Sequence, residues 1–242
     1  TQVRLTAFDP SNGGRFLYTT LPGWPTPAAT FTNPNLELFA LFFRDGNLVP
    51  GTARTPFSYP VGAQAIALAQ QGSPGAPWTQ PDYLAQRLRP GDTIALTQRG
   101  YGSPIQVFHS DAITLSNLTI QGSSSFAVMF DSTSDSVADH VRVQPRPGGL
   151  IGSNVDGIHF VSARQNNHIR HCFVTRTVDD GLILDSQYIA TVLSRPGPRQ
   201  LRVRRSFFLR FPNGTPVNFV NAVTTSEITS GAVCHHVPAQ NS

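Results

Sequence analysis

The sequence contains no lysine, and all 18 of its basic residues are arginine. Codon usage in a GC-rich genome produces such a bias without any functional reason, whereas arginine also offers two N–H groups at once to a carboxylate or sulfate. Charged residues make up only 13% of the chain, and the net charge is +4. The densest basic stretch, RQLRVRR at 199–205, alternates like one solvated face of a strand. We therefore expect no nucleic-acid partner.

Cysteine is almost absent as well. The only two cysteines are Cys172 and Cys234, without a CxxC pair or metal-type spacing, so one disulfide and two separate thiols both stay open. The CHH stretch at 234–236 has no paired carboxylate or histidine cluster near it in the sequence. We therefore expect no metal and no cofactor.

Long apolar runs are missing too. No stretch reaches the roughly 18 residues of a membrane span, and no signal peptide is visible, so we expect no membrane partner. Because the chain begins at Thr1 without a methionine, we expect a processed protein or an excised piece of one.

Turn-forming residues are plentiful, since glycine and proline number 20 each. The first 100 residues combine Pro-interrupted aromatic stretches with the apolar run LELFALFF at 36–43 and the turn-to-strand sequence RPGDTIAL at 89–96. These patterns are typical of short strands joined by long loops, and no stretch predicts a stable helix. Residues 1–100 are therefore predicted to be a β-rich, loop-rich and barrel-like accessory region.

A repeat of short strands begins near residue 104. Leu118 and Val141 occupy equivalent places in strands 23 residues apart, and Gly157 and Gly181 do so 24 residues apart. Such repeats without helical periodicity predict an all-β fold over 101–242, a right-handed parallel β-helix (solenoid). A hairpin insert at about 186–223 is expected to form a small barrel-like excursion. A β-sandwich with irregular turns is the alternative.

The ends of a solenoid need covers, and no amphipathic helix at either end could supply one. We therefore expect a homo-oligomer, or chain segments missing from this sequence, to cover them. Asn117 and His140 fall at equivalent places before their strands, where polar stacks often form.

Three acidic residues recur in two similar frames, SNVDGIHF at 153–160 and TVDDGLIL at 177–184. Asp156 and Asp180 precede matching strands, so stacking would place their Cβ atoms about 5 Å apart. Carboxylates at that distance repel unless they share a proton, a water molecule or a cation. The third acid, Asp179, lies beside the second. Asp-Gly is also a common turn dipeptide, so simple turn chemistry is the structural alternative.

The trio suits glycoside hydrolysis by inversion, which needs one protonated acid and one carboxylate base that holds a water molecule. Asp179 is the predicted acid, and Asp156 with Asp180 would hold the water. Retention with a pair about 5–5.5 Å apart stays open at this stage, as does a Ca²⁺ site.

The two frames resemble the paired signature of β-helical glycoside hydrolases. Asn154, Asp156 and Gly157 match the Asn-Thr-Asp-Gly motif of the polygalacturonase family (family 28), and the double Asp at 179–180 matches its second motif. That family's later Gly-His-Gly and Arg-x-Lys motifs have no counterpart here, and the second is impossible without lysine.

The α-1,3-galactosidases of family 110 are more similar, over about residues 105–222. Asp156, His159 and Phe160 match their Asp-x-x-His-Phe motif, the double Asp follows, and 188–208 resembles their hairpin-rich segment. This resemblance implies an inverting exo-α-galactosidase that acts on an oligosaccharide or polysaccharide, needs no metal, and is secreted or periplasmic.

Four further residues are candidates for substrate binding. Strict alternation places His159 opposite Asp156 unless the strand starts after the aspartate, so both a structural role and a sugar contact stay open. Arg142 and Arg146 could bind sugar hydroxyls or lie on the surface, and Trp24 could stack on a sugar ring or pack in the core.

Two other functional classes compete with the hydrolase. One is a non-catalytic glycan-binding β-helix of the adhesin or tailspike type. The other is a Ca²⁺-dependent lyase or a polygalacturonase-like enzyme on acidic polysaccharide, and the lyase would use Arg170 or Arg176 as its base.

Overall fold

The protein is described by a computed structural model covering residues 1–11, 14–27, 38–52, 55–60, 64–68, 80–98, 102–185, 191–204, 214, 216–220 and 227–232. Strands dominate this part of the chain, and the helix α2 (Pro81–Ala85) is short. The prediction of an all-β chain is therefore confirmed, although no helix was expected where α2 lies. No helix among these residues is long and apolar enough to cross a membrane.

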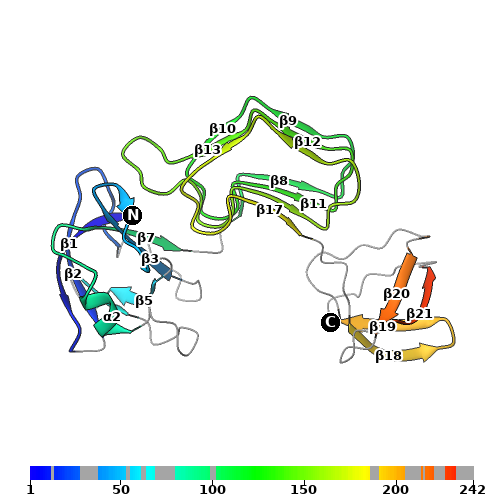
Figure 1. Ribbon diagram of the computed structural model, residues 1–242, viewed down its shortest axis with the longest axis horizontal. Helices are drawn as coiled ribbons and strands as arrows, with labels where there is room; N and C mark the ends of the chain where they lie inside the picture. The colour runs from blue at the N-terminus through cyan, green and yellow to red at the C-terminus, as the bar shows by residue number, and fades with distance from the viewer. Residues whose placement is uncertain are drawn as a thin grey trace.

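A closed antiparallel barrel occupies the N-terminal part of the chain (Figure 1). Its six strands pair in the order β3-β5-β6-β2-β1-β7, and β7 closes the barrel by pairing with β3 as well as β1. The strands are β1 (Gln2–Asp9), β2 (Arg15–Thr20), β3 (Leu38–Arg44), β5 (Thr55–Pro60), β6 (Ala65–Leu68) and β7 (Thr93–Gln98), and β4 (Asn47–Leu48) extends β3 as a hairpin.

Alternation along the strands fills the barrel. In β2, Phe16 and Tyr18 are buried while Arg15 and Leu17 are exposed, as expected for a strand with one face in the core. The apolar run of β3 serves two cores instead of one. Phe42 belongs to the barrel interior, whereas Leu41 and Phe43 face outward. These two pack, with Ala95 of β7, against a second set of apolar side chains: Leu150, Ile151 and Val178.

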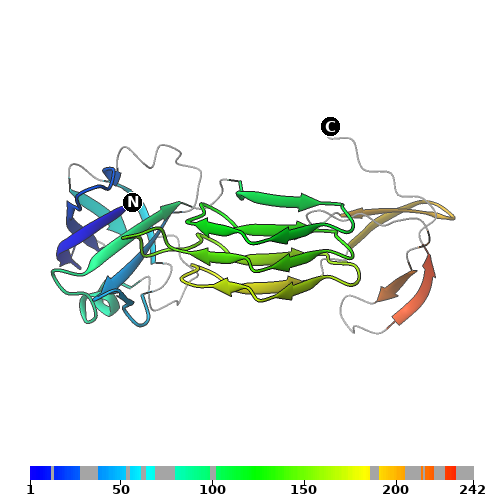
Figure 2. The ribbon, with the colours of Figure 1, turned by 90° about the horizontal axis from the view of Figure 1, so that it is seen from above.

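Three short parallel sheets follow the barrel (Figure 2). The first has the order β17-β14-β11-β8, the second β15-β12-β9, and the third β10-β13-β16. Their strands are β8 (Ile105–Phe108), β9 (Thr114–Ser116), β10 (Thr119–Gln121), β11 (Val128–Asp131), β12 (Val137–Asp139), β13 (Arg142–Gln144), β14 (Ile158–Val161), β15 (His168–Arg170), β16 (Phe173–Val174) and β17 (Leu182–Asp185).

Apolar side chains from these sheets share one core, in which Ile120, Val143, Ile158 and Phe160 are buried. In-register pairing of β11 with β14 places Phe130 opposite Phe160, and the two rings stack with centroids 4.2 Å apart. Parallel pairing thus stacks like side chains in rows.

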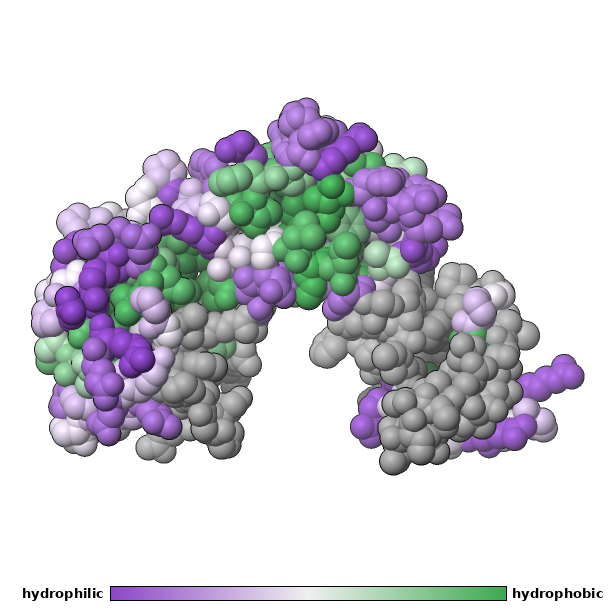
Figure 3. Space-filling model, viewed as in Figure 1, coloured by the Kyte–Doolittle hydropathy of each residue, from purple (hydrophilic) through white to green (hydrophobic). Residues whose placement is uncertain are grey.

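The end of the first parallel sheet is apolar and open. Leu182 and Leu184 pair in register with the core residues Ile158 and Phe160, yet they are 47% and 66% exposed. Figure 3 shows apolar side chains gathered on this face over the parallel sheets. The expected cover from a homo-oligomer or from missing chain stays a prediction, and these side chains are what a cover would bury.

Two antiparallel pairs lie beyond β17. One joins β18 (Thr191–Gly197) to β19 (Gln200–Arg204), and the other joins β20 (Pro216–Val220) to β21 (Glu227–Ala232). Every described residue of β19 is exposed, in agreement with the solvated strand expected at 199–205. Cys234 and the CHH stretch lie outside the described residues, as do parts of the segment 186–223.

The predicted fold class, a right-handed parallel β-helix solenoid with a barrel-like excursion after the double Asp, is wrong. The closed barrel lies before the parallel strands, and the parallel strands form mostly separate short sheets of three or four strands. The physical reason is that a strand alternates with a period of two whether its neighbour is parallel or antiparallel. Alternation and repeat spacing therefore do not fix how strands assemble into sheets.

The division of the chain at residue 100 stays a prediction. Barrel strands do lie before residue 99 and parallel strands after residue 104. However, the outward face of β3 and β7 packs against Leu150, Ile151 and Val178, and the Asn154 side-chain amide donates to the carbonyl of Gln98 at 2.8 Å. The two parts therefore share buried contacts.

Two equivalent glycines offer a test of the packing between β14 and β17. A Cβ at Gly157 would lie 2.5 Å from the carbonyl oxygen of Gly181 and would overlap a methyl group of Val174, whereas a Cβ at Gly181 would meet only that side chain at 3.7 Å. We expect Gly157→Ala to lower the free energy of unfolding by about 1–3 kcal/mol. The matched control Gly181→Ala should change it by about 0.5 kcal/mol or less. Urea unfolding measures both, and equal losses would contradict this packing.

Candidate functional site

The three predicted acids lie together where two parallel strands begin. Asp156 precedes Gly157 and β14, and Asp180 precedes Gly181 and β17. The Gly157 N–H donates to the carbonyl of Asp180 at 3.0 Å, so the two Asp-Gly frames run side by side. One carboxylate oxygen from each of Asp156, Asp179 and Asp180 lies within 4.8 Å of the other two. The structure therefore brings the whole trio together.

The loop before β14 is held by Ser153, which is fully buried. Its hydroxyl donates to the carbonyls of Ser125, at 2.6 Å, and Asp156, at 2.8 Å. Its own carbonyl accepts the N–H of Val178 at 2.9 Å, just before the double Asp. Backbone contacts thus tie the two acidic frames to each other, which keeps the carboxylates close despite their repulsion.

The three acids differ in their contact with solvent. Asp156 is 4% exposed, Asp179 is half-buried, and Asp180 is exposed. The buried carboxylate is fixed at both oxygens. Oδ1 accepts the backbone N–H of Asp180 at 3.1 Å, and Oδ2 lies 2.8 Å from Nδ1 of His159. Asp156 therefore forms the rigid base of the trio, while Asp180 is open to a ligand.

His159 lies on the same side as Asp156 because β14 starts at Ile158, after the aspartate. Its ring is buried between two carboxylates, with Nδ1 2.8 Å from Asp156 and Nε2 3.6 Å from Asp185. Neither nitrogen has a well-aligned hydrogen bond, so both contacts are charge contacts. The edge of Phe126 packs against the ring at 4.9 Å. Burial favours a role in holding Asp156 over a direct sugar contact.

Sequence reasoning missed Asp185, the second carboxylate at His159. It ends β17 and pairs in register with Val161, one residue beyond the histidine's own partner Ile183. The signal was present in the strand parity, because residues 183 and 185 share a side of β17 as 159 and 161 share a side of β14.

The other candidates for substrate binding lie in separate contacts. The Arg146 guanidinium stacks over the ring of Trp24 at 3.9 Å, so the structure joins these two candidates to each other. Arg142, on β13 of the third sheet, lies 5.0 Å over Phe173. Among the interactions described, none joins these side chains to the trio, and their role in binding stays a prediction.

The two candidate lyase bases also differ. Nε of Arg170 lies 3.2 Å from Oδ2 of Asp139, away from the trio's own contacts. Arg176 is exposed and lies three residues before Asp179. Arg176 is therefore the better placed of the two.

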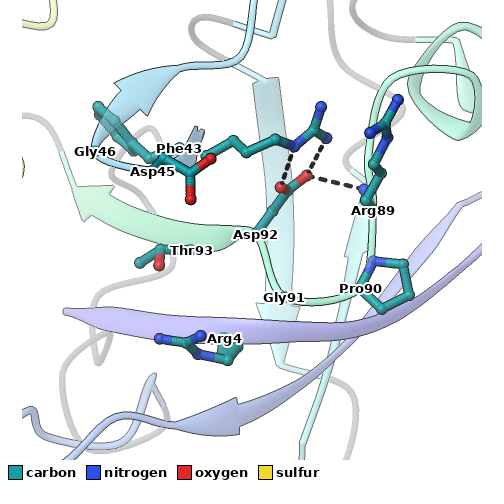
Figure 4. A pocket seen from close by; sticks show the side chains of 10 residues that line it. Arg4, Phe43, Asp45, Gly46, Arg89, Pro90, Gly91, Asp92 and Thr93 are labelled. Atoms are coloured by element: carbon teal, nitrogen blue, oxygen red, sulfur yellow. Dashed lines mark hydrogen bonds and ion pairs between the residues drawn. The ribbon is translucent and has the colours of Figure 1, made fainter.

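A cavity of about 510 Å³ on the barrel contains none of the predicted residues (Figure 4). Its central charges are paired: Arg44 donates to both oxygens of Asp92 at 2.8 Å, and Asp92 also accepts the N–H of Arg89 at 2.8 Å. Hydrogen bonding to Asp92 raises the pKa of Arg44. These polar groups hold the turn before β7, and the cavity does not serve the acidic site.

No protein-family model matches the chain, and no curated protein matches it either. The likeness to glycoside hydrolases therefore depends on the short motifs around the trio alone.

The contact between Asp156 and His159 can be measured by a double-mutant cycle. We expect His159→Leu to lower the free energy of unfolding by about 2–4 kcal/mol, because it leaves a buried carboxylate without its cation. The coupling between His159→Leu and Asp156→Asn should be about 1–3 kcal/mol. Asp185→Asn is the matched control, and its coupling to His159 should be smaller because the separation is 3.6 Å. A larger coupling to Asp185 would reverse the roles assigned here.

Proposed function

We propose that the chain is a glycoside hydrolase in which Asp156, Asp179 and Asp180 carry out the reaction. The observation that carries the proposal is the approach of these carboxylates to within 4.8 Å of one another. Charged residues are scarce in this chain, and three acids side by side repel. Glycoside hydrolysis is a chemistry that uses such a group, since it needs a proton donor and a carboxylate on either side of one bond.

Asp156 and Asp180 are the proposed water-holding pair. A water molecule that donates to two carboxylates lies about 2.5–3.0 Å from each, so the two oxygens can be up to about 5–6 Å apart. The observed limit of 4.8 Å leaves room for one such water. Asp156 is fixed and buried, and Asp180 is exposed, so the water would lie between a rigid partner and a solvent-facing one.

Asp179 is the proposed general acid. The water-holding carboxylates must be ionised, and a proton on the third acid removes part of the repulsion within the trio. Asp179 is half-buried and belongs to a different position in its frame from the stacked pair, which leaves it free to face the leaving oxygen. A water-holding pair and a separate acid give inversion at the anomeric carbon.

A neutral sugar is the proposed substrate. A polygalacturonate chain would bring further carboxylates against three acids, and the chain lacks lysine to balance them. The motif likeness to the α-1,3-galactosidases of family 110 makes terminal α-1,3-linked galactose the substrate to test first. Trp24 and Arg146 stay candidates for additional contacts with the sugar.

A Ca²⁺-dependent lyase is the second candidate, and the same distance favours it. Ca²⁺ binds carboxylate oxygens at about 2.3–2.6 Å, so three oxygens within 4.8 Å could share one ion. Arg176 would then be the base. This reaction gives an unsaturated product and stops when a chelator removes the ion.

The decisive measurement is galactose release from an oligosaccharide that ends in α-1,3-linked galactose, with proton NMR to read the anomer formed first. We expect β-galactose, and we expect Asp179→Asn to lower kcat by about 10²–10⁴-fold because it removes the proton donor. Asp135→Asn is the matched control: it changes an exposed aspartate outside the trio and should leave kcat unchanged. Circular dichroism confirms that each variant is folded.

Other outcomes point elsewhere. First formation of α-galactose would contradict the water-holding pair. A Ca²⁺-dependent unsaturated product from an acidic polysaccharide would establish the lyase. Glycan binding without cleavage, kept in Asp156→Asn, would establish the binding module instead.

A further inference from the structure

A second cluster of polar side chains lies at the corner that follows β12 and β15. Asp139 ends β12, His140 comes next, and His171 occupies the matching corner 31 residues later. Nδ1 of His140 lies 2.8 Å from Oδ1 of Asp139, and Nδ1 of His171 lies 2.9 Å from the same oxygen. The two imidazole rings stack with centroids 4.6 Å apart and an angle of 34°.

The backbone fixes this arrangement. Asn117, His140 and His171 each have φ of 54°, the left-handed conformation that Asn and His adopt more readily than most residues. The N–H of Asn117 donates to the carbonyl of Asp139, and the N–H of His140 donates to the carbonyl of Arg170. The three corners are therefore stacked, and the two histidines project from the same place in consecutive layers.

Arg170 orients the shared carboxylate. Its Nε donates to Oδ2 of Asp139 at 3.2 Å and leaves Oδ1 to the imidazoles. The hydrogen bond from His171, then that from His140 and the charge of Arg170, lower the pKa of Asp139 against the opposing effect of desolvation. The carboxylate is therefore an ionised ligand at neutral pH.

We propose that Asp139, His140 and His171 bind a divalent transition-metal ion such as Zn²⁺. Two imidazole nitrogens and one carboxylate oxygen are a ligand set that zinc accepts, and a water molecule completes four-coordination. The converging ligand atoms of the three residues all lie within 4.8 Å of one another. Both histidine side chains are more than half exposed, at 58% and 64%, so an ion can enter from solvent.

Small side-chain movements complete the site. Zn–N and Zn–O bonds of about 2.0–2.2 Å in a tetrahedron separate the ligand atoms by about 3.3–3.5 Å. The present separations of 2.8 and 2.9 Å must therefore open by about half an ångström. Arg170 keeps Oδ2 meanwhile, in the way that hydrogen-bonded partners commonly orient a ligating carboxylate. The bound ion would join the corner after β12 to the corner after β15.

The test is isothermal titration of the whole chain with ZnCl₂ at pH 7.5, where both imidazoles are neutral. We expect His140→Asn and His171→Asn each to lower the affinity of one Zn²⁺ by at least about tenfold. Asparagine is the suitable replacement because Asn117 holds the equivalent corner at the same φ. His168→Asn is the matched control, an exposed histidine on β15 outside the cluster, and should keep the affinity.

Zinc bound elsewhere, at 234–236 or at the acidic trio, persists in the double variant His140→Asn/His171→Asn and is subtracted. Histidine ¹⁵N spectra give the second measurement, in which Zn²⁺ should shift the Nδ1 signals of His140 and His171. Equal Zn²⁺ binding in wild type and the double variant would overturn the proposal. The corner would then be a hydrogen-bonded stack alone.

Discussion

The arrangement of the acidic site depends on one constraint, the in-register parallel pairing of β14 with β17. This pairing places Gly157 against the backbone of Gly181 so closely that a side chain would not fit. It also places Asp156 beside the N–H of Asp180, which donates to its carboxylate. A slip by one residue would move every side chain of a strand to its other face and separate the acids.

A buried carboxylate needs compensation, and the structure supplies it locally. Asp156 has a backbone donor at one oxygen and His159 at the other, and His159 contacts a second carboxylate in Asp185. Asp179 and Asp180 face increasing amounts of water. Carboxylates in such different surroundings can take different roles in one reaction, which is the pattern that acid–base catalysis uses.

The sequence allowed the all-β class and the meeting of Asp156 with Asp180 to be predicted, because both depend on local patterns. The assembly of strands into a barrel and separate parallel sheets was beyond it, since alternation is the same for either kind of neighbour. His159 was left open because its direction depends on where β14 starts. The meeting of His140 with His171 was missed because the inserted loop 145–153 makes their separation 31 residues, longer than the 23–24 of the regular repeat.

The strand β3 has a consequence for how the chain loses its structure. Its inward residues build the barrel, while Leu41 and Phe43 pack on Leu150, Ile151 and Val178 of the parallel-sheet region. A protease cut near residue 100 would expose apolar surface on both fragments, at a free-energy cost of about 25 cal/mol for each Å² uncovered. The barrel and the acidic site therefore share one cooperative unit of unfolding, and damage to either lowers the resistance of the other to proteolysis.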